Sequence, residues 1–179
     1  MHRATAMRNY RWKPIREQVK LWYERQQLAL LELPAVQLAA TFGATTAVAH
    51  ARTLIIKLRY QTRVEFILCI SPMEKRANLT NIRKEFGAST AWIATMGEVV
   101  SRTQSLPGCV PAFGSLFGLP VVIDVSLLKD PFMFAPSGRP GHAVCIPLNA
   151  FVGIERPRLL DFASHEPLGH GESLPVESA

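Results

Sequence analysis

The apolar pattern in the first part of the chain predicts two helices. The first is expected to begin near Pro14, which suits the first turn of a helix. Its apolar face recurs at the i, i+4, i+7 and i+8 spacing and consists of Ile15, Val19, Trp22 and Tyr23. An apolar run at residues 28–33 fits either a strand or the end of this helix, and Pro34 interrupts it. A second helix is predicted over residues 35–42, ended by Gly43.

The next part of the chain reads as a β-hairpin followed by two capped helices. Residues 53–58 and 64–70 are rich in β-branched and aromatic residues, and the polar segment between them suits a turn. Asn78 is expected to cap a helix that runs through Phe86 to Gly87 and exposes Arg83 and Lys84 to solvent. Thr95 and Glu98 have the spacing of a capping box, which predicts a short helix to about Arg102, after a strand at residues 91–94.

Short strands and irregular loops alternate in the second half of the chain. We expect strands at residues 119–125, 132–135 and 143–146, a turn at residues 126–130 and a last helix at residues 148–152. Beyond Glu155 the composition is polar with scattered proline and glycine, which is typical of a tail with little structure. Because strands and helices are interleaved without regular βαβ spacing, the pattern predicts an α+β domain with a mixed sheet. Its expected bounds are residues 13–154, between an arm at 1–12 and a tail at 155–179.

Between the last capped helix and the strand at residues 119–125 lies a segment with the sequence GCVPAFG, residues 108–114. Gly108 and Gly114 permit unusual backbone angles and Pro111 restricts its neighbour, so we expect an irregular loop with outward-pointing amide groups. Such a loop can bind a carbonyl oxygen or an anion. A plain loop before a buried strand is the simpler interpretation of this segment taken alone.

Composition narrows the class of protein. The chain has 179 residues, 48% of them hydrophobic and 19% charged, which is ordinary for one globular domain. No apolar stretch is long enough to span a membrane, and we expect a cytoplasmic protein. Its three cysteines have no metal-type spacing; Cys69 and Cys145 are expected in the core. The formal net charge of +6 favours a polyanionic partner such as RNA, although a bland soluble protein can have this balance too.

Four segments together resemble the YbaK-like domains associated with prolyl-tRNA synthetase, a family that hydrolyses wrongly charged aminoacyl-tRNA. The segments are LAATFGATTAVAHARTLIIK (38–57), ISPMEKRANLTNIRKEFG (70–87), GCVPAFGSLFGLPVVID (108–124) and SGRPGHAVCIPLNAF (137–151). They occur in family order and cover roughly residues 35–152. The resemblance implies a mixed sheet curved towards a barrel, with a pocket between the 108–114 loop and the strand that begins at the family lysine.

The resemblance also implies a reaction and its site. Backbone amides of the loop would hold the ester carbonyl while a water attacks, helped by the ribose hydroxyl, and neither a metal nor another cofactor is needed. The implied catalytic positions are Arg52, Gly108, Cys109, Val110 and Gly114. The implied substrate-binding positions are Pro111, Phe113, Ser137, Gly138 and His142. The basic residues expected to contact tRNA are Lys75, Arg76, Arg83 and Lys84.

Two positions depart from the family pattern. Arg52 stands where relatives usually have lysine, and residues 33–40 lack the threonine and acids that relatives tend to place there. Arginine keeps the charge but not the shape of lysine. The sequence therefore leaves two functions open. The first is an aminoacyl-tRNA deacylase, with a small amino acid on tRNA-Pro as the substrate and a synthetase as a further partner. The second is a non-catalytic regulator that binds aminoacyl-tRNA or a nucleotide. In a third interpretation the arm at residues 1–12 is the main RNA contact.

Asp124 is expected to be a strand-end turn residue, and the Cys109 thiol is not expected to act as a nucleophile, because no base is evident beside it.

Overall fold

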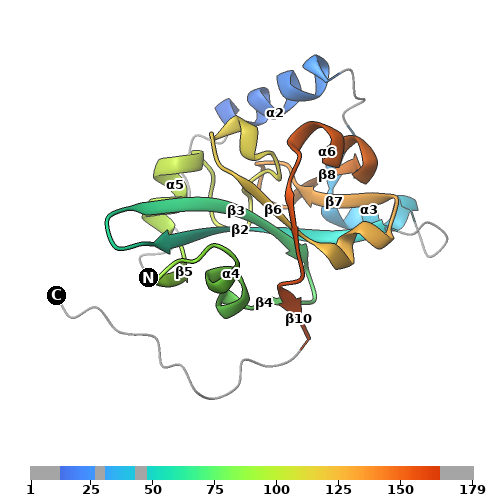
Figure 1. The fold of residues 1–179 in the computed structure, drawn as a ribbon. Coiled ribbons are helices and arrows are strands. Elements are labelled where there is room, and N and C mark those ends of the chain that lie inside the picture. The colour runs from blue at the N-terminus through green and yellow to red at the C-terminus, as the bar shows by residue number, and fades with distance from the viewer. Residues whose placement is uncertain (1–12, 27–30, 43–47, 166–179) are drawn as a thin grey trace, which may run out of the picture.

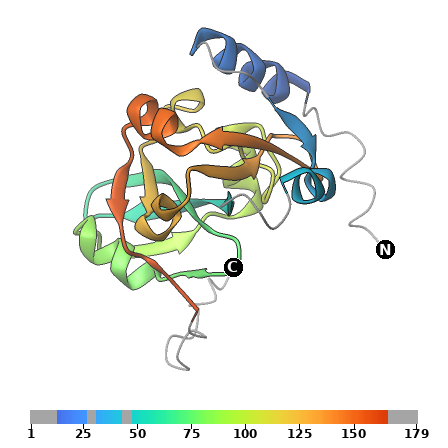
Figure 2. The ribbon, with the colours of Figure 1, turned by 90° about the vertical axis from the view of Figure 1, so that its right-hand side faces the viewer.

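The computed structural model describes residues 13–26, 31–42 and 48–165 (Figures 1 and 2). The expected arm at 1–12 and the last residues of the expected tail, 166–179, lie outside this part. In chain order the elements are α2 (Lys13–Arg25), β1 (Glu32–Pro34), α3 (Ala35–Phe42), β2 (Val48–Arg59), β3 (Val64–Pro72), β4 (Arg76–Ala77), α4 (Leu79–Glu85), β5 (Thr90–Ile93), α5 (Met96–Thr103), the 3-10 helix η2 (Gly114–Leu116), β6 (Val121–Asp124), the 3-10 helix η3 (Val125–Lys129), β7 (Phe132–Pro136), β8 (His142–Pro147), α6 (Leu148–Glu155), β9 (Arg158–Leu160) and β10 (Ala163–Ser164).

One mixed sheet of eight strands organises the domain. Its strand order is β1-β8-β7-β2-β3-β6-β9, and β5 also pairs with β2. The long strand β2 joins two halves of the sheet, because its first residues pair in parallel with β7 and its later residues pair antiparallel with β3 and β5. The α+β class is therefore confirmed. The sheet curves without closing into a barrel, since its terminal strands β1 and β9 do not pair with each other.

Each face of the sheet carries its own apolar cluster. In Figure 1, α2 and α6 lie above strands β2 and β3, and α4 lies below them. The larger cluster contains Ala51 and Ile55 of β2 together with residues of α2 and α6. The smaller cluster contains Ile56 and Leu58 of the same strand together with Ile82 of α4. Because successive side chains of a strand point to opposite faces, this alternation fixes which residues of β2 face which cluster.

The locally encoded elements agree closely with the sequence pattern. The Asn78 side chain accepts hydrogen bonds from the first turn of α4, and Gly87 follows that helix with a φ of +60°. Thr95 and Glu98 form the predicted capping box of α5. The hairpin β2–β3 is confirmed and is longer than predicted at both strands. The apolar face of α2 is confirmed at Val19, Trp22 and Tyr23, which are buried.

The expectation of a tail with little structure from residue 155 was wrong for residues 155–164. Strand β9 pairs in parallel with β6, and Phe162 is buried in the smaller cluster. The fully buried carboxylate of Asp124 accepts hydrogen bonds from the backbone N–H groups of Phe162 at 2.9 Å and Ala163 at 2.7 Å. It also accepts one from the backbone N–H of Ser126 at 3.0 Å. Asp124 therefore does end its strand, and it also anchors this C-terminal segment.

Other expectations concern boundaries and absences. Within the described residues, no helix is long and apolar enough to cross a membrane. In the same ranges, no group of three or more histidine, cysteine, aspartate or glutamate side chains is arranged to hold a metal ion. Cys69 and Cys145 are buried as expected, and burial raises the pKa of the Cys69 thiol. Of the ambiguous run at residues 28–33, the described end belongs to strand β1.

Candidate functional site: an amide-lined loop

The 108–114 loop is fixed to the sheet and to the leading helix. The hydroxyl of Thr53 on β2 donates a buried hydrogen bond of 2.6 Å to the carbonyl of Val110. Phe113 is fully buried, and its ring stacks on Trp22 of α2 with 4.0 Å between centroids. Tyr23 meets the same ring edge-on at 5.5 Å. The loop is therefore held by β2 on one side and by α2 on the other.

Two glycines give this loop its path. Gly108 has a φ of +80°, a backbone conformation that other residues adopt only with strain. Gly114 is required for a different reason, because a Cβ there would lie 2.3 Å from the carbonyl oxygen of Leu119 and 2.3 Å from a methyl group of Val121. The chain thus passes too close to the start of β6 for any side chain at residue 114.

The loop presents a run of buried amide groups without partners. Val110, Ala112, Phe113 and Gly114 are all buried, and within the described part of the chain none of their N–H groups has a hydrogen-bond acceptor. Buried backbone N–H groups are nearly always paired in proteins. Unpaired N–H groups that converge on one point can hold the oxygen of a carbonyl or an oxyanion.

Other expected positions in this loop contribute differently. The N–H of Cys109 already donates to the carbonyl of Leu106 at 2.9 Å, so this amide is not available to a ligand. Burial raises the pKa of the half-exposed Cys109 thiol, which lowers its reactivity. Pro111 is buried and has no N–H to offer. The side chain of Phe113 belongs to the core, which leaves only its backbone for contact with a substrate.

A second loop joins β7 to β8 and contains the other expected substrate positions. Ser137 is buried, and its hydroxyl donates to Glu32 of β1 at 2.9 Å. Gly138 has a φ of +90°. His142 is half-buried, pairs with Pro34 across β8 and β1, and lies with Nδ1 3.1 Å from the carbonyl oxygen of Pro140. These contacts fix the second loop to the junction of β1 and α3.

Arg52 does not lie beneath the 108–114 loop, contrary to the expectation of one cleft between them. It is the neighbour of Thr53 on β2, so the two side chains point to opposite faces of the sheet. Thr53 faces the loop, whereas the guanidinium of Arg52 donates to the hydroxyl of Ser71 at 3.4 Å and to the carbonyl of Lys75. Burial, followed by the positive charge of Arg76, lowers the pKa of Arg52, and Glu74 opposes this effect.

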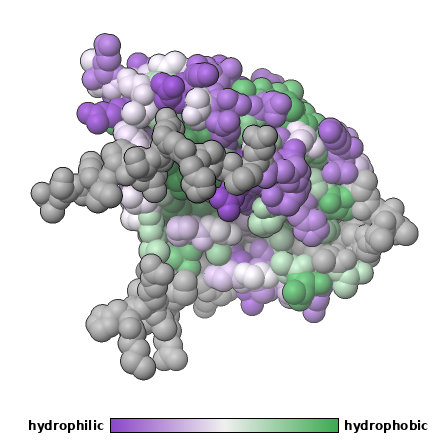
Figure 3. Space-filling view, turned by 90° about the horizontal axis from the view of Figure 1, so that it is seen from below, coloured by the Kyte–Doolittle hydropathy of each residue, from purple (hydrophilic) through white to green (hydrophobic). Residues whose placement is uncertain are grey.

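The expected tRNA contacts fall into two pairs. Lys75 and Arg76 follow β3 and adjoin Arg52, and Arg76 is exposed on β4. Lys84 is exposed and Arg83 half-buried in the last turn of α4. In Figure 3, which views the molecule from the α4 side, hydrophilic residues cover much of the surface that is not grey. The two pairs thus belong to elements on the same side of the sheet as Arg52.

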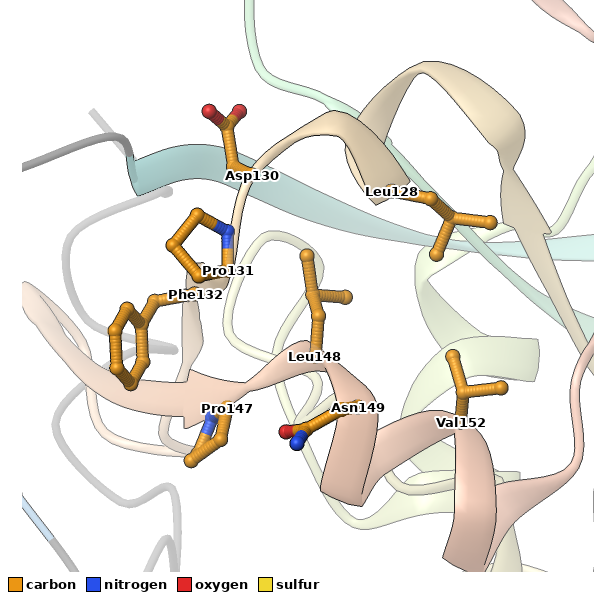
Figure 4. Close-up of a pocket in the computed structure, with 8 residues that line it drawn as sticks. All are labelled: Leu128, Asp130, Pro131, Phe132, Pro147, Leu148, Asn149 and Val152. Atoms are coloured by element: carbon orange, nitrogen blue, oxygen red, sulfur yellow. The ribbon is translucent and has the colours of Figure 1, made fainter.

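Two surface pockets lie elsewhere, and neither is lined by Arg52 or by the 108–114 loop. One of about 550 Å³ is mainly apolar, with Leu128, Leu148 and Val152 pointing toward a shared space in Figure 4. The other, of about 310 Å³, lies where β2 leaves β3 and includes His50 and Lys129. The sequence pattern did not reveal these pockets, because each is formed by segments that are distant along the chain.

Comparison with solved structures supports the fold. A candidate trans-editing enzyme for prolyl-tRNA synthetase has a TM-score of 0.69 and 22% identity, covering 84% of this chain and 98% of that one. The hypothetical protein APE2540 has a TM-score of 0.69 and 21% identity, covering 82% and 99%. A candidate signal-transduction protein from Marinobacter aquaeolei VT8 has a TM-score of 0.62 and 16% identity, covering 84% of this chain but 30% of that one. Among curated proteins, no match is found.

These structures show that the chain has the fold of a trans-editing domain. A family model described as the aminoacyl-tRNA editing domain matches residues 34–154, which is more than half of the chain. The chain belongs to the aminoacyl-tRNA editing domain family. The resemblance found in the sequence is therefore confirmed.

Proposed function

We propose that this protein is an aminoacyl-tRNA deacylase that acts in trans on the ester bond of a mischarged tRNA. The observation that carries the proposal is the run of buried amides at Val110, Ala112, Phe113 and Gly114, for which the described part of the chain supplies no acceptor. When water attacks an ester, the carbonyl oxygen becomes an oxyanion, and donors fixed in advance stabilise that charge without reorganisation. The loop is rigidly held by Thr53 and by packing on α2, as this role requires.

The proposed substrate is a small amino acid, such as alanine or cysteine, on tRNA-Pro. Membership of the editing family supports an aminoacyl ester, and the likeness to a candidate trans-editing enzyme for prolyl-tRNA synthetase supports this tRNA. The ester is already activated, so a positioned water, helped by the ribose hydroxyl, suffices as the nucleophile. Ser137, Gly138 and His142 would contact the amino acid or the terminal adenosine. The synthetase would be the source of the mischarged substrate.

The basic residues on the α4 side would bind phosphates of the tRNA. Arg52 and Arg76 are close enough for the charge of Arg76 to lower the pKa of Arg52. A bound phosphate would reduce the repulsion between these two guanidinium groups. We therefore expect the tRNA phosphates to contact this pair together with Lys75, Arg83 and Lys84. In this arrangement Arg52 contributes to affinity for tRNA and not to the bond-breaking step.

The direct test is deacylation of a panel of mischarged tRNAs by the purified chain. We expect hydrolysis of at least one small aminoacyl ester on tRNA-Pro above the buffer rate. No hydrolysis of any member of the panel by folded protein would contradict the deacylase proposal.

Substitution of Arg52 tests whether this residue acts in tRNA binding or in ester hydrolysis. We expect Arg52→Ala to raise KM several-fold with little change in kcat, and Arg52→Lys to stay close to wild type, because charge alone acts at this position. Arg63→Ala is the matched control, since Arg63 pairs with Glu65 in an exposed ion pair on the hairpin. A fall in kcat for Arg52→Lys would contradict the proposed role and place Arg52 at the ester.

A second candidate function is a non-catalytic protein that binds aminoacyl-tRNA or a nucleotide. The observation that favours it is Arg52, which replaces the family lysine and whose guanidinium binds Ser71 and the Lys75 carbonyl instead of facing the loop. This candidate predicts tight, salt-sensitive binding of aminoacyl-tRNA without turnover. A gain of turnover in Arg52→Lys would favour it, whereas efficient turnover by the wild-type chain would exclude it.

A further inference from the structure

A chain of three side chains connects the end of the loop to two residues outside the family match. The indole N–H of Trp22 on α2 donates to the hydroxyl of Ser115 at 3.1 Å. That hydroxyl donates to one carboxylate oxygen of Glu155 at 2.5 Å, and the backbone N–H of Ser115 donates to the other at 3.1 Å. The family match ends at residue 154, so both Trp22 and Glu155 lie beyond it. We refer to these residues as the Trp22–Ser115–Glu155 network.

The network acts on the loop directly. Ser115 directly follows Gly114 in the chain. Because Glu155 binds the Ser115 N–H, it fixes the peptide group that joins Gly114 to Ser115. The Trp22 ring, whose N–H binds Ser115, is the same ring that stacks on Phe113 at 4.0 Å. A carboxylate that accepts two hydrogen bonds from one residue holds it in a single orientation. The network therefore restrains the end of the loop that carries Phe113 and Gly114.

The end of α6 is built against local preference. Glu155 is the last residue of this helix, where a negative charge opposes the helix dipole. Arg156 caps the helix in the left-handed conformation with a φ of +47°, a place that usually holds glycine. When local propensity is overridden at one point, a tertiary or functional contact is the expected reason. Here the contact is the one between Glu155 and Ser115.

We propose that Glu155, Ser115 and Trp22 are positioning residues that hold the amides of the 108–114 loop in place for the carbonyl of the substrate. The inference rests on the proposed deacylase function and assigns part of the site to α2 and to the end of α6. The three side chains do not touch the ester themselves. Their effect is on the rate of the chemical step, through the orientation of the amides that receive the developing charge.

The test combines kinetics with hydrogen exchange of the loop. We expect Glu155→Ala to lower kcat about tenfold or more with KM nearly unchanged, since loss of a whole oxyanion donor costs about 10²–10³-fold. Glu155→Gln keeps one of the two acceptor oxygens and should recover part of the rate. Trp22→Phe keeps the ring on Phe113 but removes the N–H, and should give a smaller fall. Ser115→Ala should resemble Glu155→Ala, because it removes the hydroxyl that joins the other two.

The matched control is Glu85→Ala, which removes a half-exposed glutamate that forms an ion pair with Arg158, away from the loop. In Glu155→Ala, amides in residues 108–117 should exchange faster, while those of Glu85→Ala match wild type. Unchanged exchange in Glu155→Ala would overturn the inference, and so would equal kcat values for Glu155→Ala and Glu85→Ala. If Glu155→Ala does not fold, Ser115→Ala and Trp22→Phe decide in the same way.

Failure of the two proposals can be told apart. An inactive wild-type chain contradicts the deacylase function and leaves the exchange measurement to test whether the network holds the loop. An active wild-type chain whose network variants keep full kcat contradicts only the positioning role.

Discussion

Removal of the Asp124 carboxylate should release the C-terminal segment from the domain. The side chain is fully buried and accepts backbone N–H groups from Phe162 and Ala163 at 2.9 and 2.7 Å, besides the N–H of Ser126 at 3.0 Å. In Asp124→Ala these donors lose their acceptor. A buried donor left unpaired costs roughly 1–3 kcal/mol, and the N–H groups of Phe162 and Ala163 are both buried, so the loss of Asp124 should cost about 2–6 kcal/mol of unfolding free energy.

The effect is measurable by denaturant and thermal unfolding. For a chain of this size 1 kcal/mol corresponds to roughly 2–4 °C, so Asp124→Ala should lower Tm by about 10 °C. Asp124→Asn keeps one acceptor oxygen and should lose less. Hydrogen exchange should speed up first in β9 and around Phe162, because these lose their anchor.

The control is Asp161→Ala, which removes an exposed carboxylate from the same segment. This variant should stay within about 0.5 kcal/mol of wild type, as most exposed substitutions do. An equally neutral Asp124→Ala would show that the segment from β9 to Phe162 does not depend on this carboxylate.

Three further predictions concern the core, the loop and pH. The Tyr23 hydroxyl is buried without a hydrogen-bond partner among the described residues, so Tyr23→Phe should stabilise the protein by up to about 1 kcal/mol in denaturant unfolding; a loss above about 1 kcal/mol would show that the hydroxyl is bound. Gly114→Ala should lower stability by about 2 kcal/mol or more and reduce deacylation, because its Cβ would lie 2.3 Å from backbone; unchanged stability would contradict this close approach. Hydrogen bonds from the Lys57 ammonium and the Thr95 N–H hold the pKa of Glu98 below its ordinary value. The stability that Glu98 contributes over Glu98→Gln should therefore be complete at neutral pH and fade below about pH 4, as the carboxylate is protonated; a difference that grows on acidification would have the wrong sign.

The parts of the fold that the sequence predicts are those with local causes. The Asn78 cap of α4 and the Thr95–Glu98 capping box depend on residues within one helical turn, and both are observed. The β2–β3 hairpin depends on two apolar runs joined by a polar turn. By contrast, β9 forms because it pairs with β6 and because Asp124 binds backbone groups nearly forty residues away. No pattern within residues 155–165 encodes that partner.

The candidate site was predictable to a similar extent. Gly108, Gly114 and Pro111 predict an irregular loop, and the strand alternation already implies that Arg52 and Thr53 point to opposite faces. The loop lies on one face of the sheet because Val110 contacts β2 and Phe113 contacts α2. These contacts join segments far apart in the chain, and no local sequence pattern predicts them. The same holds for Ser115 and Glu155, whose contact spans forty residues. The predicted last helix ended at residue 152, three residues before the Glu155 with which α6 ends in the structure.

In the proposed function, the amides of the 108–114 loop receive the ester carbonyl of an aminoacyl-tRNA end. The most direct measurement is the amide NMR spectrum of the labelled chain during titration with alanyl-adenosine joined through a non-hydrolysable amide bond. We predict that the N–H resonances of Val110, Ala112, Phe113 and Gly114 shift on binding, while that of Cys109, which is already paired with Leu106, shifts less. Saturable binding that shifts resonances elsewhere and leaves these four unchanged would contradict the account.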